Sequence, residues 1–406
     1  MAVVACLGSQ AIAYGMALTP PVLAVALAAD YGIPPSAIGL YTTTLFLSAL
    51  VSAATGGAIV KRFGAIRASQ MSLLAGALGL ALVAIPISAV GLLGAVAIGL
   101  GYGPMTPSGS HLLARLTTAR NRPLVFSVKQ TSIPLGGAIA GLLPPAIATG
   151  VGWQPAVLAM AAAGLVAALG LQAIRSAYDA DRRPHEPLSL RVVGPVREVL
   201  ANPDLRRIVV MSFAYAAVQS AFSAFFVTFL VERADLDLVS AGFVLTLGLV
   251  VAIFARIGWG AVAERVMSTP NALALIGVMM SACCLLSRAG SPAWSLPALL
   301  LLSATFGLSA VGWNGLYLAE IVRVTSAAAS ARATGGTLVF TFAGTTVMPA
   351  VFSLLVAVSG GYTAAFVAVA LVPIPAVLAM LTWKAPKPVP LEAVDAAVVE
   401  RSDAGG

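Results

Sequence analysis

Lys129 and Gln130 lie within the stretch FSVKQTSIPLGG (residues 126–137), between segments built from alanine, leucine, valine, glycine and isoleucine. An ammonium group in such surroundings must either extend to solvent or be bonded by a polar or oppositely charged group. Three roles fit Lys129. Its aliphatic chain could extend so that the ammonium group reaches the polar membrane surface. Alternatively, the ammonium group could pair with Glu320, or it could bind an anionic substrate. The residue types leave all three open.

Two further titratable residues, Glu320 and His111, lie in apolar stretches of their own. An unpaired carboxyl group takes up a proton when it is buried, because burial disfavours its charged form, so Glu320 could carry protons. Alternatively it could pair with Arg323, three residues further along the same helix face. The imidazole of His111 can gain or lose a proton near neutral pH. The alternative for His111 is a hydrogen-bonded group at the edge of its apolar segment.

Uncharged polar residues form a third group of candidates. The group consists of Gln10, Tyr14, Tyr215, Gln219, Trp313 and Asn314. Gln10 with Tyr14, and Tyr215 with Gln219, are each spaced i, i+4, which places each pair on one helix face. An amide beside an aromatic ring suits a small polar or aromatic solute. The alternative is hydrogen bonding between neighbouring helices.

The residue patterns of the common enzyme chemistries are missing from the sequence. Its three cysteines, Cys6, Cys283 and Cys284, have neither metal-site spacing nor the pattern of a disulfide framework. The chain has no GxxxxGK[ST] phosphate-binding loop and no serine–histidine–aspartate arrangement. We therefore expect no enzyme activity, no metal, no cofactor and no ATP hydrolysis.

The segments that carry the candidate residues are too apolar for a water-soluble protein. The 406-residue chain is 59% hydrophobic and 9% charged, with a mean hydropathy of +0.97, whereas a soluble domain carries about 25% charged residues. Its apolar segments repeatedly reach the length of about 20 residues that crosses a bilayer as a helix. We predict an all-α membrane protein with twelve transmembrane helices. The spans are expected near residues 2–28, 37–60, 69–88, 90–113, 124–149, 155–175, 206–231, 239–262, 271–289, 294–321, 333–358 and 362–383.

Lysine and arginine divide unevenly between the predicted loops. If the N-terminus is cytoplasmic, 21 of the 23 basic residues lie in or beside cytoplasmic loops, and only Arg233 and Arg288 lie on the other side. The positive-inside rule then places both termini in the cytoplasm. We expect the chain in the cytoplasmic (inner) membrane of a cell. The same distribution explains the net charge of +8 without a nucleic acid as partner.

The longest polar stretch, residues 176–205, lies between six predicted spans and six more. Its prolines and mixed charges indicate a cytoplasmic linker, in which VREVLANPDLRR could form a short surface helix. The chain then divides into a first six-helix bundle (1–175), the linker, and a second six-helix bundle (206–385). Residues 386–406 are expected to form a disordered cytoplasmic tail.

The two halves repeat one another. Four pairs of segments align in the same order, with only a small drift in their spacing: Gly39 with Gly242, Gly57 with Gly260, 99–115 with 307–323, and 152–161 with 361–370. Such a series of matches indicates a duplicated six-helix unit. Two parallel repeats around an axis along the membrane normal form a known transporter architecture.

A loop signature links the chain to a family. The loop after the second span, GAIVKRFGAIR (residues 57–67), resembles the G-x-L-a-D-R-x-G-R signature of the major facilitator superfamily. The second copy, RIGWGAVAER (residues 256–265), is closer, with Glu264 at the acidic position, whereas Lys61 replaces the acid in the first copy. The glycine- and proline-rich stretch 133–145 resembles the family's fifth span. The resemblance covers essentially the whole chain, although the fourth span lacks the buried arginine of many proton-coupled members.

The resemblance implies two pseudo-symmetric six-helix bundles that rock around a site near the midplane. It implies that spans 1, 4, 7 and 10 line the cavity, so the uncharged polar group named above, with Lys129 and Gln130, would bind substrate. It also implies that spans 4, 5, 10 and 11 meet at a cytoplasmic gate. The expected gate or coupling residues are Glu320, His111, Lys129, Arg256, Glu264 and Arg265.

These observations favour a monomeric secondary active transporter that moves a small organic solute by alternating access. Lys129 favours an organic anion such as a carboxylate, moved by symport or antiport with H+ as a possible coupling ion. A drug or cation exporter of the same fold is the alternative, but it would be expected to carry an acid deep in the cavity, and Glu320 is the only candidate. A membrane enzyme or a transporter-like sensor is disfavoured, because the sequence offers neither a catalytic group nor an evident output domain.

Overall fold

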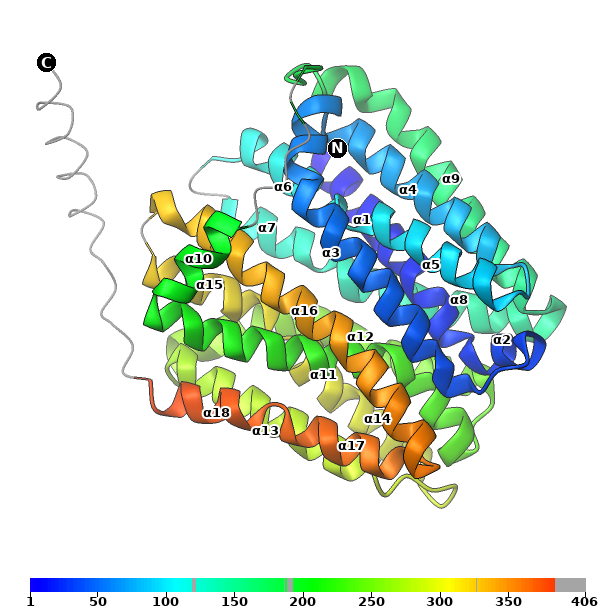
Figure 1. Ribbon diagram of the computed structural model, residues 1–406. Coiled ribbons are helices and arrows are strands. Elements are labelled where there is room, and N and C mark those ends of the chain that lie inside the picture. The colour runs from blue at the N-terminus through cyan, green and yellow to red at the C-terminus, as the bar shows by residue number, and fades with distance from the viewer. Residues whose placement is uncertain (119–121, 186, 188–192, 326, 384–406) are drawn as a thin grey trace, which may run out of the picture.

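The computed structural model of the protein is built from helices that run roughly side by side (Figure 1), and it describes residues 1–118, 122–185, 187, 193–325 and 327–383. In this part of the chain, twelve helical segments are long and apolar enough to cross a membrane. The spans of the first half are α1 (Ala2–Val22) with α2 (Ala24–Tyr31), η1 (Pro35–Ala37) with α3 (Ile38–Phe63), α4 (Ala65–Val83), α5 (Ser88–Tyr102) with α6 (Met105–Leu116), α7 (Arg122–Gln130) with α8 (Ser132–Val151), and α9 (Trp153–Tyr178). The spans of the second half are α11 (Pro203–Ala234), α12 (Leu238–Arg265), α13 (Thr269–Ser287), α14 (Leu296–Phe306) with η2 (Gly307–Val311) and α15 (Asn314–Val324), α16 (Ala327–Ser359), and α17 (Tyr362–Leu371) with α18 (Ile374–Leu381). The prediction of twelve transmembrane helices is confirmed.

The third span begins earlier than the predicted residue 69. Helix α4 begins at Ala65, directly after Gly64, whose backbone has φ +94°. The carboxylate of Asp179, just past the end of α9, accepts hydrogen bonds from the backbone N–H groups of Ile66 (2.8 Å) and Arg67 (2.9 Å). These two bonds satisfy orphan donors of the first turn, and the negative charge suits the positive end of the helix.

Several spans are broken in their interior. Leu23 separates α1 from α2 just after Pro20 and Pro21, and Thr131 separates α7 from α8. The tenth span contains η2, a π-helical turn between α14 and α15. Such breaks free backbone carbonyl groups, which must be satisfied inside the protein, and π-helical turns occur frequently at functional sites. The breaks at Thr131 and η2 position the candidate site described below.

The repeat seen in the sequence is also present in the packing within each half. A Cβ atom on Gly99 of α5 would lie 2.1 Å from the carbonyl oxygen of Leu45 on α3. A Cβ atom on Gly307, the residue that aligns with Gly99, would lie 1.8 Å from the carbonyl oxygen of Gly248 on α12. Leu45 and Gly248 are equivalent in the alignment that matches Gly39 with Gly242, so both partners of the contact recur. In each half a glycine lets two helix backbones touch.

The two halves meet along two seams. Helix α3 lies beside α16, as Figure 1 shows, and helix α8 lies beside α12. Thr43 donates to the carbonyl oxygen of Thr346 (2.8 Å) and Ser353 to that of Ser36 (2.6 Å), both across the first seam. Thr246 donates to the carbonyl oxygen of Ala138 (3.3 Å) across the second.

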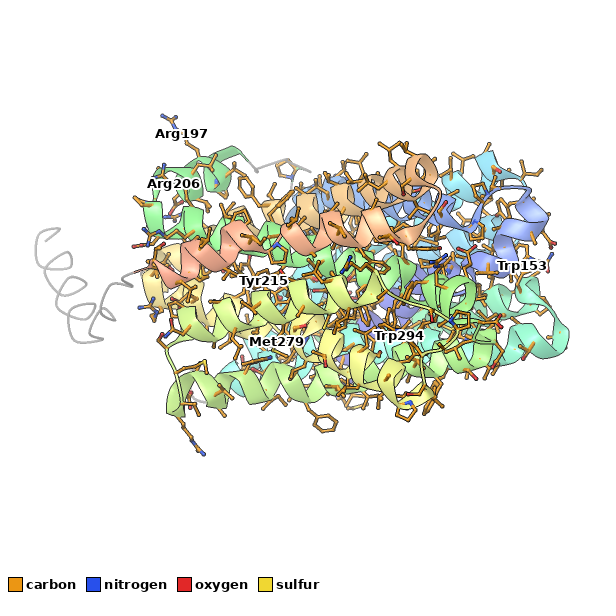
Figure 2. All side chains as sticks on the ribbon, turned by 90° about the horizontal axis from the view of Figure 1, so that it is seen from below. Trp153, Arg197, Arg206, Tyr215, Met279 and Trp294 are labelled. Carbon is orange, nitrogen blue, oxygen red and sulfur yellow. The ribbon has the colours of Figure 1, made fainter. Side chains whose placement is uncertain are left out.

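The two ends of the bundle carry different parts of the chain. One end, here called the linker end, carries Met1, the ends of α6 and α9, and residues 179–185 and 193–202 of the connection between the halves. Figure 2 shows Arg197 and Arg206 at this end and Trp153 towards the opposite end, here called the far end. Helix α10 (Val193–Ala201) belongs to the connection and packs against α16, with Val199 fully buried. The predicted tail, residues 386–406, lies outside the described residues.

Candidate functional site

Three side chains of α1 form a stripe that faces the interior of the protein. Cys6, Gln10 and Tyr14 follow one another at intervals of four residues, and all three are buried. The amide nitrogen Nε2 of Gln10 donates to Thr106 Oγ1 on α6 (3.2 Å). The hydroxyl of Tyr14 lies 3.5 Å from Ser223 Oγ on α11 and therefore reaches across to the second half. The predicted Gln10–Tyr14 face thus lies where the halves meet.

Lys129 lies at the linker-side end of this stripe. Its side chain is only 1% exposed, and its Nζ is covered and has no hydrogen-bond partner in the described part of the chain. The side chain of Lys129 fits here because Gly109 of α6 has no side chain. A Cβ atom on Gly109 would lie 3.0 Å from Lys129 Cε and 3.6 Å from Cys6 Cβ. The ammonium group therefore points into the protein and does not reach the surface in this structure.

Arg256 of α12 lies close to Lys129 on the other side of the boundary between the halves. Its Nε donates to the carbonyl oxygen of Val311 (3.1 Å), at the end of η2, and its Nη1 donates to the carbonyl oxygen of Gln130 (2.5 Å), at the end of α7. Its Nη2 is buried and has no partner among the described residues. The breaks in the fifth and tenth spans thus supply the two carbonyl groups that hold this guanidinium.

The two cations share one electrostatic environment. Arg256 and Lys129 lie within electrostatic reach of each other, and Arg256 lies within the same reach of the hydroxyl groups of Tyr14 and Tyr102. Tyr102 packs on Tyr14 with ring centroids 5.9 Å apart. Neither cation forms an ion pair with any described carboxylate. Two buried positive charges without a counter-charge are costly, so an anion that reached them would be stabilised.

The second-half candidates form a network of their own. Gln219 Oε1 accepts from Trp313 Nε1 (3.1 Å) and from Asn314 Nδ2 (3.4 Å). Trp313 is fully buried, whereas Gln219 and Asn314 are half-buried. Tyr215 donates to the carbonyl oxygen of Leu273 on α13 (2.5 Å). Tyr215 is therefore turned into the helix packing of the second half, and its hydroxyl is already satisfied.

The structure pairs Glu320 with Arg323. Glu320 is 1% exposed, its Oε2 accepts from Arg323 Nε (2.8 Å), and its Oε1 accepts from the Nη2 of the same residue. The predicted alternative partner, Lys129, does not contact it. Of the three arrangements considered from the sequence (an unpaired acid, a pair with Lys129, or a pair with Arg323), the structure contains the pair within one helix.

His111 joins a polar cluster at the linker end. Its Nε2 lies 2.7 Å from Asp181 Oδ2, and Arg115 Nη1 lies 2.5 Å from Asp181 Oδ1. Burial raises the pKa of the Asp181 carboxyl, but the hydrogen bond with His111 and the charge of Arg115 outweigh it, so this pKa lies below the usual range. His111 therefore ties the fourth span to the connection between the halves and lies away from the cations.

The signature loops contribute differently in the two halves. Glu264 and Arg265 are exposed at the linker end. In the first copy, where Lys61 replaces the acid, the carboxylate beside the loop is Asp179, and a Cβ atom on Gly64 would lie 2.3 Å from its Cγ. Asp179 and Asp181 were not among the residues predicted from the sequence. The signal for them was the pair of acids in AYDADRR (residues 177–183), directly after the sixth span.

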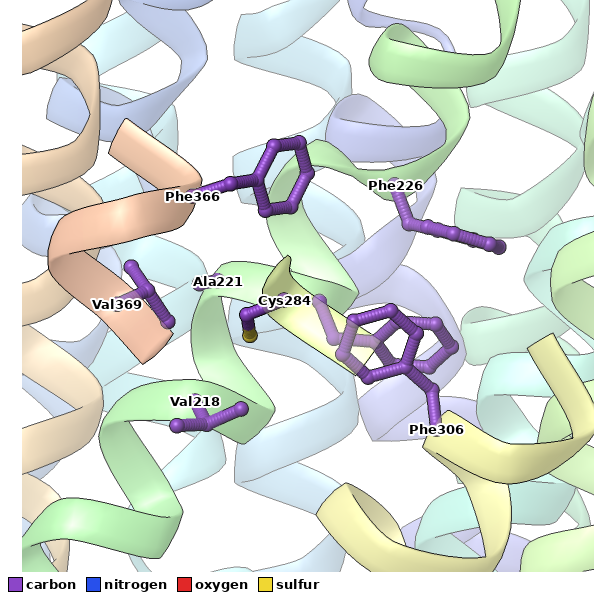
Figure 3. Close-up of a pocket in the computed structure, with 8 residues that line it drawn as sticks. Val218, Ala221, Phe226, Cys284, Phe306, Phe366 and Val369 are labelled. Atoms are coloured by element: carbon purple, nitrogen blue, oxygen red, sulfur yellow. The ribbon is translucent and has the colours of Figure 1, made fainter. Parts of the chain in front are cut away.

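A small pocket in the second half is apolar and separate from the cations (Figure 3). Its lining residues are Val218, Ala221, Phe222, Phe226, Cys284, Phe306, Phe366 and Val369. All of these side chains are apolar except the thiol of Cys284, which is a weak hydrogen-bond donor. Cavities of this composition remain dry, so the pocket does not extend the candidate site.

Solved structures with the same fold are transporters. The chain has a TM-score of 0.72 and 14% identity to a bacterial homologue of the human lysosomal transporter Spinster in an inward-facing, occupied conformation, covering 93% of this chain and 95% of that one. It has a TM-score of 0.75 and 15% identity to the peptide transporter POT in complex with sulfate, covering 94% and 93%. For the nucleoside transporter NupG the values are 0.71 and 12%, covering 94% and 99%. At these identities the likeness shows the fold alone.

The sequence itself matches a family model. The comparison with curated proteins gave no match. The model of the Major Facilitator Superfamily matches residues 5–322, which is more than half of the chain. Together with the twelve spans and the shared fold, this match makes the protein an integral, multi-pass membrane transporter, and the chain belongs to the Major Facilitator Superfamily.

Proposed function

We propose that the protein moves a small organic anion, with a carboxylate as the charged group, by alternating access of its two halves. The observation that carries this proposal is the pair of buried cations: Lys129 from the first half and Arg256 from the second each keep an N–H donor without a partner among the described residues. A carboxylate that accepted from both would satisfy the two donors and offset both charges.

The same pair argues against the alternative, an exporter of cations or cationic drugs. A cationic solute would have to approach two positive charges in surroundings of low dielectric, where like charges repel strongly. The buried acid that could attract it, Glu320, is already held by Arg323. A carboxylate near Lys129 and Arg256 would have favoured a cation, and no described ion pair supplies one.

The proposal also covers the orientation of the protein in the membrane and the ion to which transport is coupled. We place the linker end, which carries Arg197 and Arg206, in the cytoplasm of a cell with the far end outside, because the positive-inside rule favours this orientation. The anion would cross either together with H+ or in exchange for a second anion. Both modes present a carboxylate to the same two cations, and transport assays separate them.

The test is uptake by purified protein in proteoliposomes that contain a pH-sensitive dye. Monocarboxylates, dicarboxylates, sugars, amino acids and lipophilic cations are compared for the wild type, Lys129→Met and Arg206→Ala. We expect carboxylates alone to move. Lys129→Met should lower their uptake about tenfold to a hundredfold, the range for a hydrogen bond to a charged group. Arg206→Ala removes an exposed charge at the linker end and should leave uptake unchanged.

Transport of cations by the wild type, with full activity of Lys129→Met, would overturn the proposal. The dye and the vesicle contents then decide the coupling. Uptake driven by an imposed pH gradient indicates movement with H+, and uptake that needs a preloaded carboxylate indicates exchange.

A further inference from the structure

Three buried polar atoms around the candidate site have no partner among the described residues, and they differ in kind. Lys129 Nζ and Arg256 Nη2 are positively charged donors, whereas Gln10 Oε1 is a neutral acceptor. The three side chains are 1%, 7% and 1% exposed, respectively. Buried polar atoms in native proteins are nearly always hydrogen-bonded. Each of these atoms is therefore free to bond a polar atom of a bound substrate.

The three atoms lie around one short segment of α1. A Cβ atom on Gly109 would touch both Cys6 Cβ (3.6 Å) and Lys129 Nζ (3.7 Å), so the turn of α1 that contains Cys6 faces Lys129. The turn that contains Tyr14 lies within electrostatic reach of Arg256. Gln10 lies midway, four residues or about 6 Å along the helix from each. Lys129 and Arg256 are also within electrostatic reach of each other, and Gln10 lies between them along this segment.

The amide of Gln10 turns its nitrogen towards α6. Its Nε2 donates to Thr106 Oγ1 (3.2 Å), which leaves Oε1 as the free atom. Gln70, the other glutamine of the first half with a fully buried side chain, uses both ends of its amide. Its Nε2 donates to the carbonyl oxygen of Ala168 (2.8 Å), and its Oε1 accepts from Arg67 (3.2 Å).

We propose that the transported anion is a small hydroxy carboxylate, in which the carboxylate accepts from Lys129 and Arg256 while the hydroxyl group donates to Gln10 Oε1. This inference rests on the anion transport proposed above and narrows its substrate class. An amino acid could also donate to Gln10, but its ammonium group would lie beside two cations and be repelled. A hydroxyl group donates without adding charge.

The experiment compares matched pairs of substrates that differ by one hydroxyl group: glycolate with acetate, 2-hydroxypropanoate with propanoate, and malate with succinate. Competition for uptake into proteoliposomes gives an apparent affinity for each. We expect at least one hydroxy acid to bind about tenfold to a hundredfold more tightly than its partner, because a site built to bond a hydroxyl group rejects the analogue that leaves its acceptor unpaired.

Gln10→Met removes the acceptor and keeps the length of the side chain. This variant should bind each hydroxy acid and its matched plain carboxylate with affinities within about twofold of each other, while the plain carboxylates still bind. Gln70→Met is the matched control, a buried glutamine away from the site, and should keep the preference. If Gln10→Met does not fold, Thr106→Val, which frees the amide to rotate, should weaken the preference.

Three outcomes separate the two proposals. Equal affinities within every pair in the wild type, or a preference that persists in folded Gln10→Met, overturn the hydroxy acid and leave anion transport standing. Failure of every carboxylate to bind overturns both. The inference is supported if Gln10→Met loses the preference for hydroxy acids over the plain carboxylates and Gln70→Met keeps it.

Discussion

Gly39 and Gly242, which occupy equivalent positions in the repeat, make the same contact with the opposite half of the molecule. A Cβ atom on Gly39 would lie 2.3 Å from the carbonyl oxygen of Pro349 on α16, and one on Gly242 would lie 2.2 Å from that of Gly141 on α8. Gly141 and Pro349 are themselves equivalent, in the register that aligns 99–115 with 307–323. The two seams are therefore symmetry-related, and each brings helix backbones together where a glycine permits it.

This relationship predicts that the first seam must part during transport. Ser353 donates to the backbone carbonyl of Ser36 (2.6 Å) near the far end, so cysteines at these two positions should form a disulfide. The double variant Ser36→Cys with Ser353→Cys, made without the native cysteines, should lose nearly all of its uptake on oxidation and regain it on reduction. Uptake with and without dithiothreitol measures this effect.

The single variants Ser36→Cys and Ser353→Cys serve as controls and should be insensitive to oxidation. An oxidised double variant that still transports at the wild-type rate would show that the α3–α16 seam stays closed throughout the cycle.

Most of the fold could be predicted from the sequence because a bilayer restricts what the chain can do. Segments of about 20 apolar residues must be helices, and the repeat follows from aligned residues such as Gly39 and Gly242. The start of the third span was placed at residue 69, whereas α4 begins at Ala65. The cause is Asp179, which lies far from Ala65 in the chain, and hydropathy carries no signal for a contact of this kind.

Asp179 predicts a stability effect that is independent of transport. Replacing it with alanine leaves the N–H groups of Ile66 and Arg67 without their acceptor and removes a negative charge from the start of α4. We expect Asp179→Ala to lower the free energy of unfolding by about 1–2 kcal/mol, the range for a lost N-terminal cap. A thiol-reactive dye measures this in a thermal scan, because all three cysteines are buried in the folded protein.

Asp179→Asn is the matched variant for this experiment. It keeps one oxygen as an acceptor and should lose about half as much stability. Equal melting temperatures for the wild type and Asp179→Ala would show that the cap contributes nothing to stability.

The candidate site was less predictable than the fold. The sequence identified Lys129, Gln10 and Tyr14, because polar groups in apolar spans are costly and therefore conspicuous. Arg256 was predicted as a gate or coupling residue through the signature loop, and the structure places its guanidinium near Lys129, which carried the same prediction, with a hydrogen bond to the carbonyl oxygen of Gln130. That position depends on the helix breaks at Thr131 and η2, and no local pattern indicates which carbonyl groups such breaks leave free.

The cluster around Asp181 predicts a pH dependence of stability. The pKa of this carboxyl is lowered in the folded protein, so its contribution is complete above the unfolded value of about 3.9 and disappears as the pH falls through the lower folded value. Asp181→Asn should therefore melt below the wild type at pH 5–7, and the difference should vanish towards pH 3. The ion pair is partly exposed, which limits the effect to less than about 1 kcal/mol.

Thermal scans of both proteins at half-unit steps from pH 7 to pH 3 measure this effect. Glu264→Gln offers a control outside the cluster, since that side chain is exposed and belongs to no ion pair of the described residues. A difference between wild type and Asp181→Asn that persists unchanged at pH 3 would contradict a lowered pKa for Asp181.

Glu320 provides the last prediction, which separates a structural acid from a proton carrier. Arg323 holds both of its oxygen atoms, and the side chain is almost completely buried. We therefore expect Glu320→Gln to lower stability by about 1–3 kcal/mol, the range for a buried group that loses a charged hydrogen bond. Uptake driven by a pH gradient and exchange between two pools of substrate should then fall by the same factor, because both use the same weakened protein. If exchange stayed at the wild-type rate while pH-driven uptake was lost, Glu320 would be the site that couples transport to protons, and its pairing with Arg323 would describe only one state of the cycle.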